Sequence, residues 1–245
     1  MVLQVGGYAI PGATQAVALG FPHPPAGVEE SARPLGSPMP APAGGGPYGF
    51  MASQSDGHTP VAYDPCRPIH YVVRPDNAPA GGALLVQDAI SRVSQVTGLR
   101  FIDDGATEEK PVKNREPYQP DRYGKRWAPV LISWDTTVED PDLAADVAGE
   151  AGSARVSLPG GPAVYVTGAV ALDAVQFDQI LVRPGGAAVA RAIVLHELGH
   201  LVGLAHVSDA TQLMYPEASL GVVDYAAGDL TGLSRLGAGK CVPQV

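Results

Sequence analysis

The chain has 245 residues, of which 45% are hydrophobic and 17% are charged, so it can bury a core and is not globally disordered. No apolar run approaches the ~18 residues that a membrane-spanning helix needs, which excludes an integral membrane protein for this sequence. With 16 Lys and Arg against 25 Asp and Glu, the net charge of −9 disfavours nucleic acid and anionic lipid as partners and favours a neutral, cationic or peptide-like one.

Residues 1–60 differ in composition from the rest of the chain. They hold 21 of the 54 Gly and Pro residues and show no helical or strand periodicity. We therefore expect a flexible flank over residues 1–60 and a folded domain over residues 61–245. The first twenty residues carry no charge and lack the basic start of a secretory signal, yet residues 9–20 are apolar enough to be a leader remnant. An intact signal peptide and a truncated leader are both open.

Periodic segments follow in order after residue 60. The first is a strand at Ile69–Val73, followed by an amphipathic helix at residues 83–97 that stops before Gly98. The further predicted strands are Leu99–Ile102, Pro129–Trp134, Ser153–Leu158 and Ala163–Leu172, and the further helices are about Ala187–Leu201 and Asp229–Leu236. Five strands and three helices are thus expected.

Residues 103–126 carry twelve charges of both signs between two of these strands. A long solvated loop is the favoured interpretation. The alternative is a cation site that uses Asp103 and Asp104, because hard cations prefer carboxylate oxygen, but their spacing specifies no coordination shell.

Cys66 and Cys241 are the only two cysteines. A disulfide between them would tie the two ends of the domain together and contribute ~4 kcal/mol by restricting the unfolded chain. Such a bond implies export, so we expect a secreted protein. Two buried thiols in a cytoplasmic protein are the alternative.

The longest predicted helix contains the run HELGHLVGLAH, which places His196, Glu197, His200, Gly203 and His206 in a fixed order. Residues four apart share one helix face, so His196 and His200 can present two imidazoles to one ion. His206 can join them only if the chain turns sharply near Gly203, and glycine adopts the left-handed conformation that ends a helix.

Three imidazoles leave a fourth position on zinc for water, as in catalytic zinc sites. Glu197 points beside the expected metal position, which suits a general base acting on that water. The sequence therefore predicts one catalytic Zn²⁺ held by His196, His200 and His206, with Glu197 as the catalytic residue.

Residues 196–216, HELGHLVGLAHVSDATQLMYP, resemble the signature of the metzincin zinc peptidases, and of the matrixin branch in particular. The resemblance implies an α+β, zincin-like fold: a twisted five-stranded mixed sheet with three helices. It also implies that Leu213–Pro216 is the Met-turn, with Met214 beneath the metal. Asp229 resembles the acidic residue that holds the Met-turn backbone in matrixins, although an exposed Asp at a helix start fits the sequence equally well.

The chain departs from the matrixin pattern in three places. Residues 1–60 contain no cysteine, which speaks against latency through a propeptide cysteine. Few histidines remain for a second, structural zinc, and we expect His70 to be structural. Val207 stands where matrixins usually have Ser. Calcium dependence is open.

The resemblance implies a peptide or protein substrate that pairs with an edge strand at Ser153–Leu158. Residues 216–223 would then form the outer wall of an apolar specificity pocket. The leading hypothesis is a secreted, monomeric zinc endopeptidase. A non-catalytic zinc-stabilised binding module and a zinc hydrolase of a non-peptide amide are the alternatives, and Glu197 favours an enzyme over the module.

Overall fold

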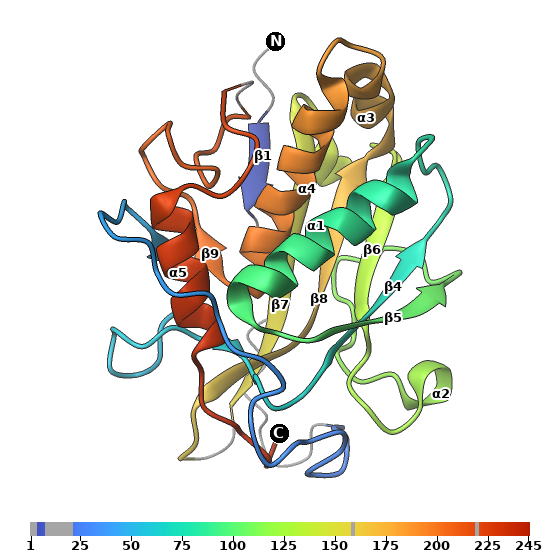
Figure 1. Cartoon of the computed structure of the whole chain (residues 1–245). Helices are drawn as coiled ribbons and strands as arrows, with labels where there is room; N and C mark the ends of the chain where they lie inside the picture. Colours follow the sequence, from blue (N-terminus) through green and yellow to red (C-terminus); the bar gives the residue numbers. More distant parts are fainter. Residues whose placement is uncertain (1–3, 8–21, 158–159, 219–220) are drawn as a thin grey trace.

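A computed structural model of the chain describes residues 4–7, 22–157, 160–218 and 221–245. The predicted leader remnant, residues 9–20, lies outside these ranges. Within them the chain has the α+β fold that the sequence predicts, with a mostly parallel sheet and several helices around one main core (Figure 1). None of the helices in the described ranges combines the length and the apolar character that crossing a membrane requires.

The described residues form a main sheet of seven strands in the order β1-β7-β8-β6-β4-β5, with β3 paired to β8 off this path. Its strands are β1 (Gln4–Gly7), β3 (Ala62–Tyr63), β4 (Ile69–Arg74), β5 (Phe101–Ala106), β6 (Val130–Asp135), β7 (Val147–Ser157) and β8 (Ala163–Asp173). Only β7 and β8 pair antiparallel; the other pairs in this sheet are parallel. The five predicted strands are all present, but the predicted count was too low.

A second sheet of two strands joins distant parts of the chain. It pairs β2 (Gly49–Phe50) antiparallel with β9 (Leu204–Ala205). The strands missing from the prediction, β1, β2, β3 and β9, have two to four residues each, which is too short for any periodicity to show.

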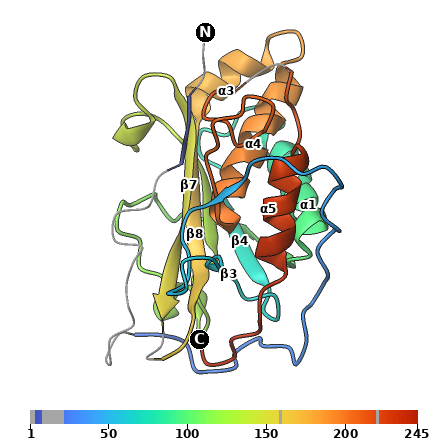
Figure 2. The ribbon, with the colours of Figure 1, turned by 90° about the vertical axis from the view of Figure 1, so that its left-hand side faces the viewer.

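Three of the helices match the predicted ones: α1 (Gly82–Thr97), α4 (Gly186–Val202) and α5 (Ala227–Gly237). They lie on one side of the sheet (Figure 2). The prediction missed α2 (Pro120–Tyr123), a 3-10 turn at Pro141–Leu143 and α3 (Ala174–Leu181). Helix α3 begins after Asp173, whose side chain accepts hydrogen bonds from the amides of Val175 and Gln176 at 2.9 and 3.0 Å.

Helix α4 carries the histidine motif and is the most deeply buried helix in the described chain. Leu195, Leu198 and Leu201 are almost completely inaccessible to solvent. The helix packs against α1 on one side and against β7 on the other. Because it is apolar nearly all round, the motif's polar side chains lie in a core and not on a surface.

Within the predicted flank, the described residues 22–60 make backbone hydrogen bonds to the rest of the chain. Ser31 donates to the carbonyl of Cys66 at 2.8 Å, and Met39 donates to the carbonyl of Val96 at 2.9 Å. The boundary at residue 60 stays a prediction. These bonds nevertheless mean that the segment contributes contacts to the domain.

Cys66 and Cys241 form a disulfide, as predicted, with a Cα–Cα distance of 5.3 Å. The buried carboxylate of Asp64 accepts hydrogen bonds from the amides of Cys66 and Val242, both at 2.8 Å. The two chain segments are therefore held together by one side chain as well as by the covalent bond.

The charged segment at residues 103–126 is more ordered than a solvated loop. Strand β5 extends to Ala106, and Glu109 is buried in a two-point ion pair with Arg115, with N–O distances of 2.8 Å. The Nδ1 of His70 lies 2.9 Å from an Asp104 oxygen, and the structural role we expect for His70 stays a prediction. Among the described residues, neither Asp103 nor Asp104 belongs to a cluster of three or more side chains that could hold a metal.

Candidate active site

Three imidazoles converge at the end of α4. The Nε2 atoms of His196 and His200 are 3.0 Å apart, and each lies 3.1 Å from the Nε2 of His206. Nitrogens bound to one tetrahedral zinc ion would lie roughly 3.3 Å apart, given Zn–N distances of ~2.0–2.1 Å. The three histidines that the sequence singled out could therefore hold a single metal ion.

The backbone fixes the protonation of two of these rings. The Nδ1 of His196 donates to the carbonyl of Leu213 at 2.7 Å, and the Nδ1 of His200 donates to the carbonyl of Leu204 at 2.8 Å, because a carbonyl can only accept. Each Nε2 is then left with a lone pair facing the other rings.

Burial keeps both rings neutral. It lowers the pKa of His196 well below its usual 6.5, and the neighbouring His200 lowers that pKa further. Burial and His206 together lower the pKa of His200 to about 3. Neutral imidazoles with inward lone pairs are the form that binds a metal.

Gly203 brings His206 back to the other two histidines. Its φ of 121° lies in a region that side chains disfavour, and its amide donates to the carbonyls of Gly199 and His200 at 3.1 and 3.0 Å. Helix α4 thus ends at Val202, one residue beyond the predicted Leu201, and the chain reverses into β9.

Glu197 is completely buried, and neither of its carboxylate oxygens has a hydrogen-bond partner among the described residues. Burial raises the pKa of Glu197 well above its usual 4.5, and Glu150 adds to this rise. A Cβ at Gly149 of β7 would lie 2.9 Å from the Cγ of Glu197, so the side chain packs against the strand at a position that only glycine fits. A buried carboxylate without a partner in the protein points to a water molecule or ion beside it.

Met214 packs against α4 at Gly199. A Cβ at Gly199 would lie 2.6 Å from its sulfur, so the absence of a side chain at residue 199 lets the methionine reach the backbone of α4 between the first two histidines. Tyr225 also contacts the backbone of α4, since its hydroxyl donates to the carbonyl of Leu195 at 2.5 Å. A soft, adaptable methionine fills this gap without competing for a metal.

The turn at Leu213–Pro216 is fastened to the start of α5. Asp229 is buried, and its carboxylate accepts from the amides of Leu213 at 2.7 Å and Met214 at 3.3 Å. Of the two interpretations of Asp229 that the sequence allowed, the structure thus shows the one in which it holds this backbone. Gln212, which the sequence did not single out, accepts from the amide of Gly228 at 2.8 Å.

A small cavity of about 10 Å³ adjoins His196. Val189, Ala192 and Ile193 of α4 line one side, and Ala218 and Val222 line another. Two residues of the predicted outer wall, 219 and 220, lie outside the described ranges. The lining is mostly apolar, and the volume is roughly that needed for one water molecule.

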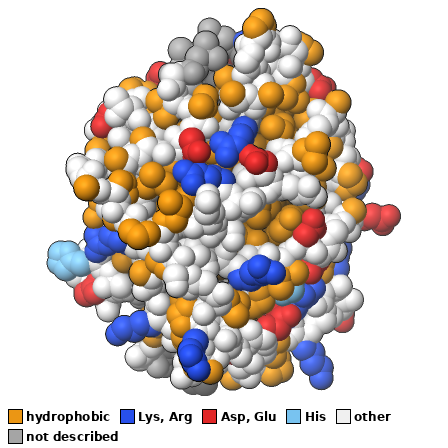
Figure 3. All heavy atoms as spheres, viewed as in Figure 1, with side chains coloured by type: hydrophobic (Ala, Val, Ile, Leu, Met, Phe, Trp, Pro, Cys, Tyr) orange, Lys and Arg blue, Asp and Glu red, His pale blue; other side chains and the backbone are white. Residues whose placement is uncertain are grey.

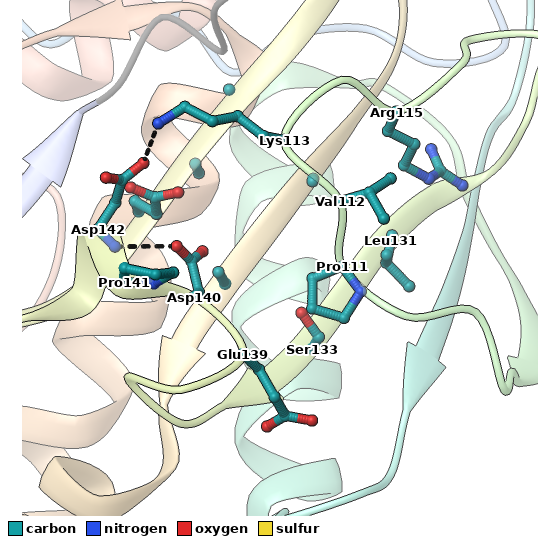
Figure 4. Close-up of a pocket in the computed structure, with 15 residues that line it drawn as sticks. Pro111, Val112, Lys113, Arg115, Leu131, Ser133, Glu139, Asp140, Pro141 and Asp142 are labelled. Carbon is teal, nitrogen blue, oxygen red and sulfur yellow. Dashed lines mark hydrogen bonds and ion pairs between the residues drawn. The ribbon is translucent and has the colours of Figure 1, made fainter.

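A larger cavity of about 230 Å³ lies on the other side of β7 (Figure 4). Gly149 faces Glu197, whereas the next residue, Glu150, lines this cavity together with Asp140 and Asp142. Lys113 reaches Asp142 at 2.9 Å. Burial, followed by Asp140 and Asp142, raises the pKa of Glu150 to about 7. This cavity contains none of the three histidines and is separate from the site.

Acidic and basic side chains lie next to one another near the middle of the face shown in Figure 3. Ion pairs of Arg92 with Asp224 and of Arg191 with Asp88 join α1, α4 and the segment before α5.

Residues 137–236 match the sequence model of the matrixin family. The chain contains a matrixin-like metallopeptidase domain. The match begins after β6 and covers β7, β8 and α3 to α5, so it includes all three histidines and Asp229. No curated protein shows significant similarity to the chain.

The matrixin-like domain supports a zinc-dependent metallopeptidase activity in general terms. The sequence pattern found the side chains that meet in the site but missed the backbone that fixes them. Gly149 and Gly199 permit the close approach of Glu197 and Met214, and the carbonyls of Leu204 and Leu213 orient two rings. The two glycines can be read in the sequence, but which side chain packs against each of them depends on the fold.

Proposed function

We propose that the chain is a zinc-dependent endopeptidase in which His196, His200 and His206 hold the metal and Glu197 is the general base. The observation that carries this proposal is the triangle of Nε2 atoms, 3.0–3.1 Å on each side. The residue after the first histidine, Glu197, is buried, and its carboxylate has no partner in the described chain. Leu213–Pro216 serves as the Met-turn.

The donor set fits zinc. Neutral imidazole nitrogens suit this borderline metal, and three protein ligands leave room for water. The carbonyls that hold the Nδ1 atoms keep the rings oriented before the metal binds. When bound, zinc acts as a Lewis acid that lowers the pKa of water from 15.7 to around 7 and polarises a carbonyl.

Glu197 performs the proton transfers. Its carboxylate accepts a proton from the attacking water and then gives it to the leaving amine of the substrate. Its Cγ packs against Gly149 of β7, and the side chain is completely buried, so it is held out of solvent.

The side of β7 on which β1 pairs is the proposed place for the substrate backbone, since an extended peptide can add to a strand by main-chain hydrogen bonds once β1 leaves it. Gly149 on this strand touches Glu197, so a peptide paired with β7 runs past the carboxylate. The mostly apolar residues that line the small cavity beside His196 then contact one substrate side chain. The disulfide supports secretion, where extracellular peptides and proteins are available as substrates.

Zinc content and peptide-library cleavage test the proposal together. The wild type should contain one zinc per chain, lose activity with a chelator and regain it with zinc. Glu197→Gln should retain zinc and lose at least 100-fold in kcat, because general acid–base catalysis contributes roughly 10²–10⁴-fold.

The matched control is Glu108→Gln, which neutralises an exposed glutamate away from the site and should be fully active. Zinc binding without cleavage of any peptide would favour a binding module, and turnover restricted to non-peptide amides would favour another hydrolase. Equal activity in wild type and Glu197→Gln would remove Glu197 from the mechanism.

A further inference from the structure

The third histidine of the site follows a short strand that is paired with a segment from near the start of the described chain. In this pairing Gly49 of β2 lies opposite Ala205 of β9, and Phe50 lies opposite Leu204. One residue further on, the amide of Met51 donates to the carbonyl of Gly203 at 2.9 Å. Residues 49–51 therefore run alongside the whole connection between α4 and His206.

His206 is the only one of the three histidines that lies outside α4, so the helix does not fix its position. On one side its turn is held by residues 49–51. On the other side the amide of Val207 donates to the carbonyl of Met214 at 3.0 Å. The backbone on both flanks of His206 is thus fixed by hydrogen bonds, one set of which comes from a segment more than 150 residues earlier in the sequence.

Strand β2 is itself anchored to α5. The guanidinium of Arg235 lies 5.7 Å from the ring centres of both Tyr48 and Phe50, and its Nη1 donates to the hydroxyl of Tyr48 at 2.8 Å. A Cβ at Gly232 would lie 3.2 Å from the Cβ of Tyr48, so the strand is close to the helix backbone. Helix α5 therefore fixes the residues before and after His206: through β2 on one side and through Asp229 and the Met214 turn on the other.

We propose that residues 48–51 are positioning residues for His206 as a metal ligand, an inference that rests on the proposed zinc site. Without them, the turn that carries His206 would have to be ordered when the metal binds, and that entropic cost would weaken binding. With them, the third imidazole already stands 3.1 Å from the other two. The segment thereby belongs functionally to the site, although it lies well before the first strand that the sequence predicted.

The test measures zinc affinity in full-length protein by competition with a chromophoric chelator, and it needs no substrate. Met51→Pro removes the amide that donates to Gly203. Ser53→Pro is the matched control, because Ser53 is exposed and its bridge to Pro60 uses the amides of Gln54 and Val61. We expect Met51→Pro to bind zinc at least tenfold more weakly than wild type and Ser53→Pro to bind it equally well.

A second variant covers the case in which Met51→Pro does not fold. Phe50→Ala keeps every backbone amide but loses the ring next to Arg235, and we expect a severalfold weaker zinc affinity with an unchanged circular dichroism spectrum of the metal-free protein. The visible spectrum of the Co²⁺ form should also shift, because it reports ligand geometry. Unchanged affinity and spectrum in folded variants, or equal losses in Ser53→Pro, would overturn the proposal. A wild type that binds no zinc would instead overturn the proposed function.

Discussion

Asp229 fixes the main chain of Met214 from a helix that begins more than ten residues further along the sequence. Both oxygens of its buried carboxylate are used, since the amides of Leu213 and Ala226 donate to one of them and the amide of Met214 donates to the other. The floor of the proposed metal site is therefore held by a charge and not by packing alone.

Asp229→Ala should destabilise the metal-free protein by about 2–4 kcal/mol, because it leaves buried amides without an acceptor. Zinc affinity should fall as well, since the Leu213 carbonyl that orients His196 belongs to the same turn. Urea unfolding in the presence of a chelator and a chelator competition assay measure the two effects. Asp121→Ala, at an exposed site, is the control, and equal unfolding midpoints for the two variants would contradict the role of Asp229.

The lowered pKa of Glu109 predicts that the free energy of unfolding decreases in acid. Burial alone would raise the pKa of Glu109, but the hydrogen bonds and charge of Arg115, helped by Tyr123 and Gln119, outweigh it and lower the pKa to about 2. Its folded-state pKa lies below the unfolded value, so the stabilisation is complete above pH ~4.5 and is lost as the pH falls through ~2. The shift corresponds to about 3 kcal/mol.

Glu109→Gln should therefore be less stable than wild type at pH 7 and should approach wild type near pH 2. Urea unfolding of the metal-free proteins at several pH values measures the difference and keeps metal release out of the result. A difference between the two proteins that is constant over this range would show that the ion pair with Arg115 contributes no pH dependence.

We expect a substitution of Val222 to change which substrate side chains are preferred. Val222 lines the small cavity beside His196, whereas its neighbour Val223 does not line it and is 37% exposed. Val222→Ala enlarges the cavity and should shift cleavage of a peptide library towards larger apolar side chains next to the cleaved bond, with Val223→Ala as the matched control. An unchanged preference in Val222→Ala would mean that substrate side chains bind elsewhere.

We expect strand β1 to weaken substrate binding by occupying the side of β7 on which the substrate is proposed to pair. It pairs in parallel with β7 from Val147 to Ala151, and this stretch includes the glycine that touches Glu197. A peptide that adds to this edge must displace β1, so a chain lacking residues 1–7 should show a severalfold lower KM with an unchanged kcat. Steady-state kinetics on one peptide measure KM and kcat for both proteins. A KM identical in the full chain and the shortened chain would place the substrate on a different edge.

The sequence was enough to predict the histidines of the candidate site, but it did not predict the backbone segments that position them. The spacing of His196, His200 and His206 is a local property of one helix and one turn, so it could be found without the fold. The pairing of Gly49 with Ala205 depends on two-residue strands that carry no pattern of their own. Composition also favoured a flexible flank, because it counts Pro and Gly but does not register backbone bonds such as that from Met39 to Val96.

The disulfide between Cys66 and Cys241 has a further consequence for the proposed endopeptidase, which could cleave other copies of itself. The two cysteines are 175 positions apart in the sequence, and the segment between them contains β4 to β9, α1 to α5 and all three histidines. A single nick anywhere within that covalent ring opens a loop but releases no fragment. Self-digestion at an exposed turn would thus leave both pieces, and the histidines they carry, attached to one another.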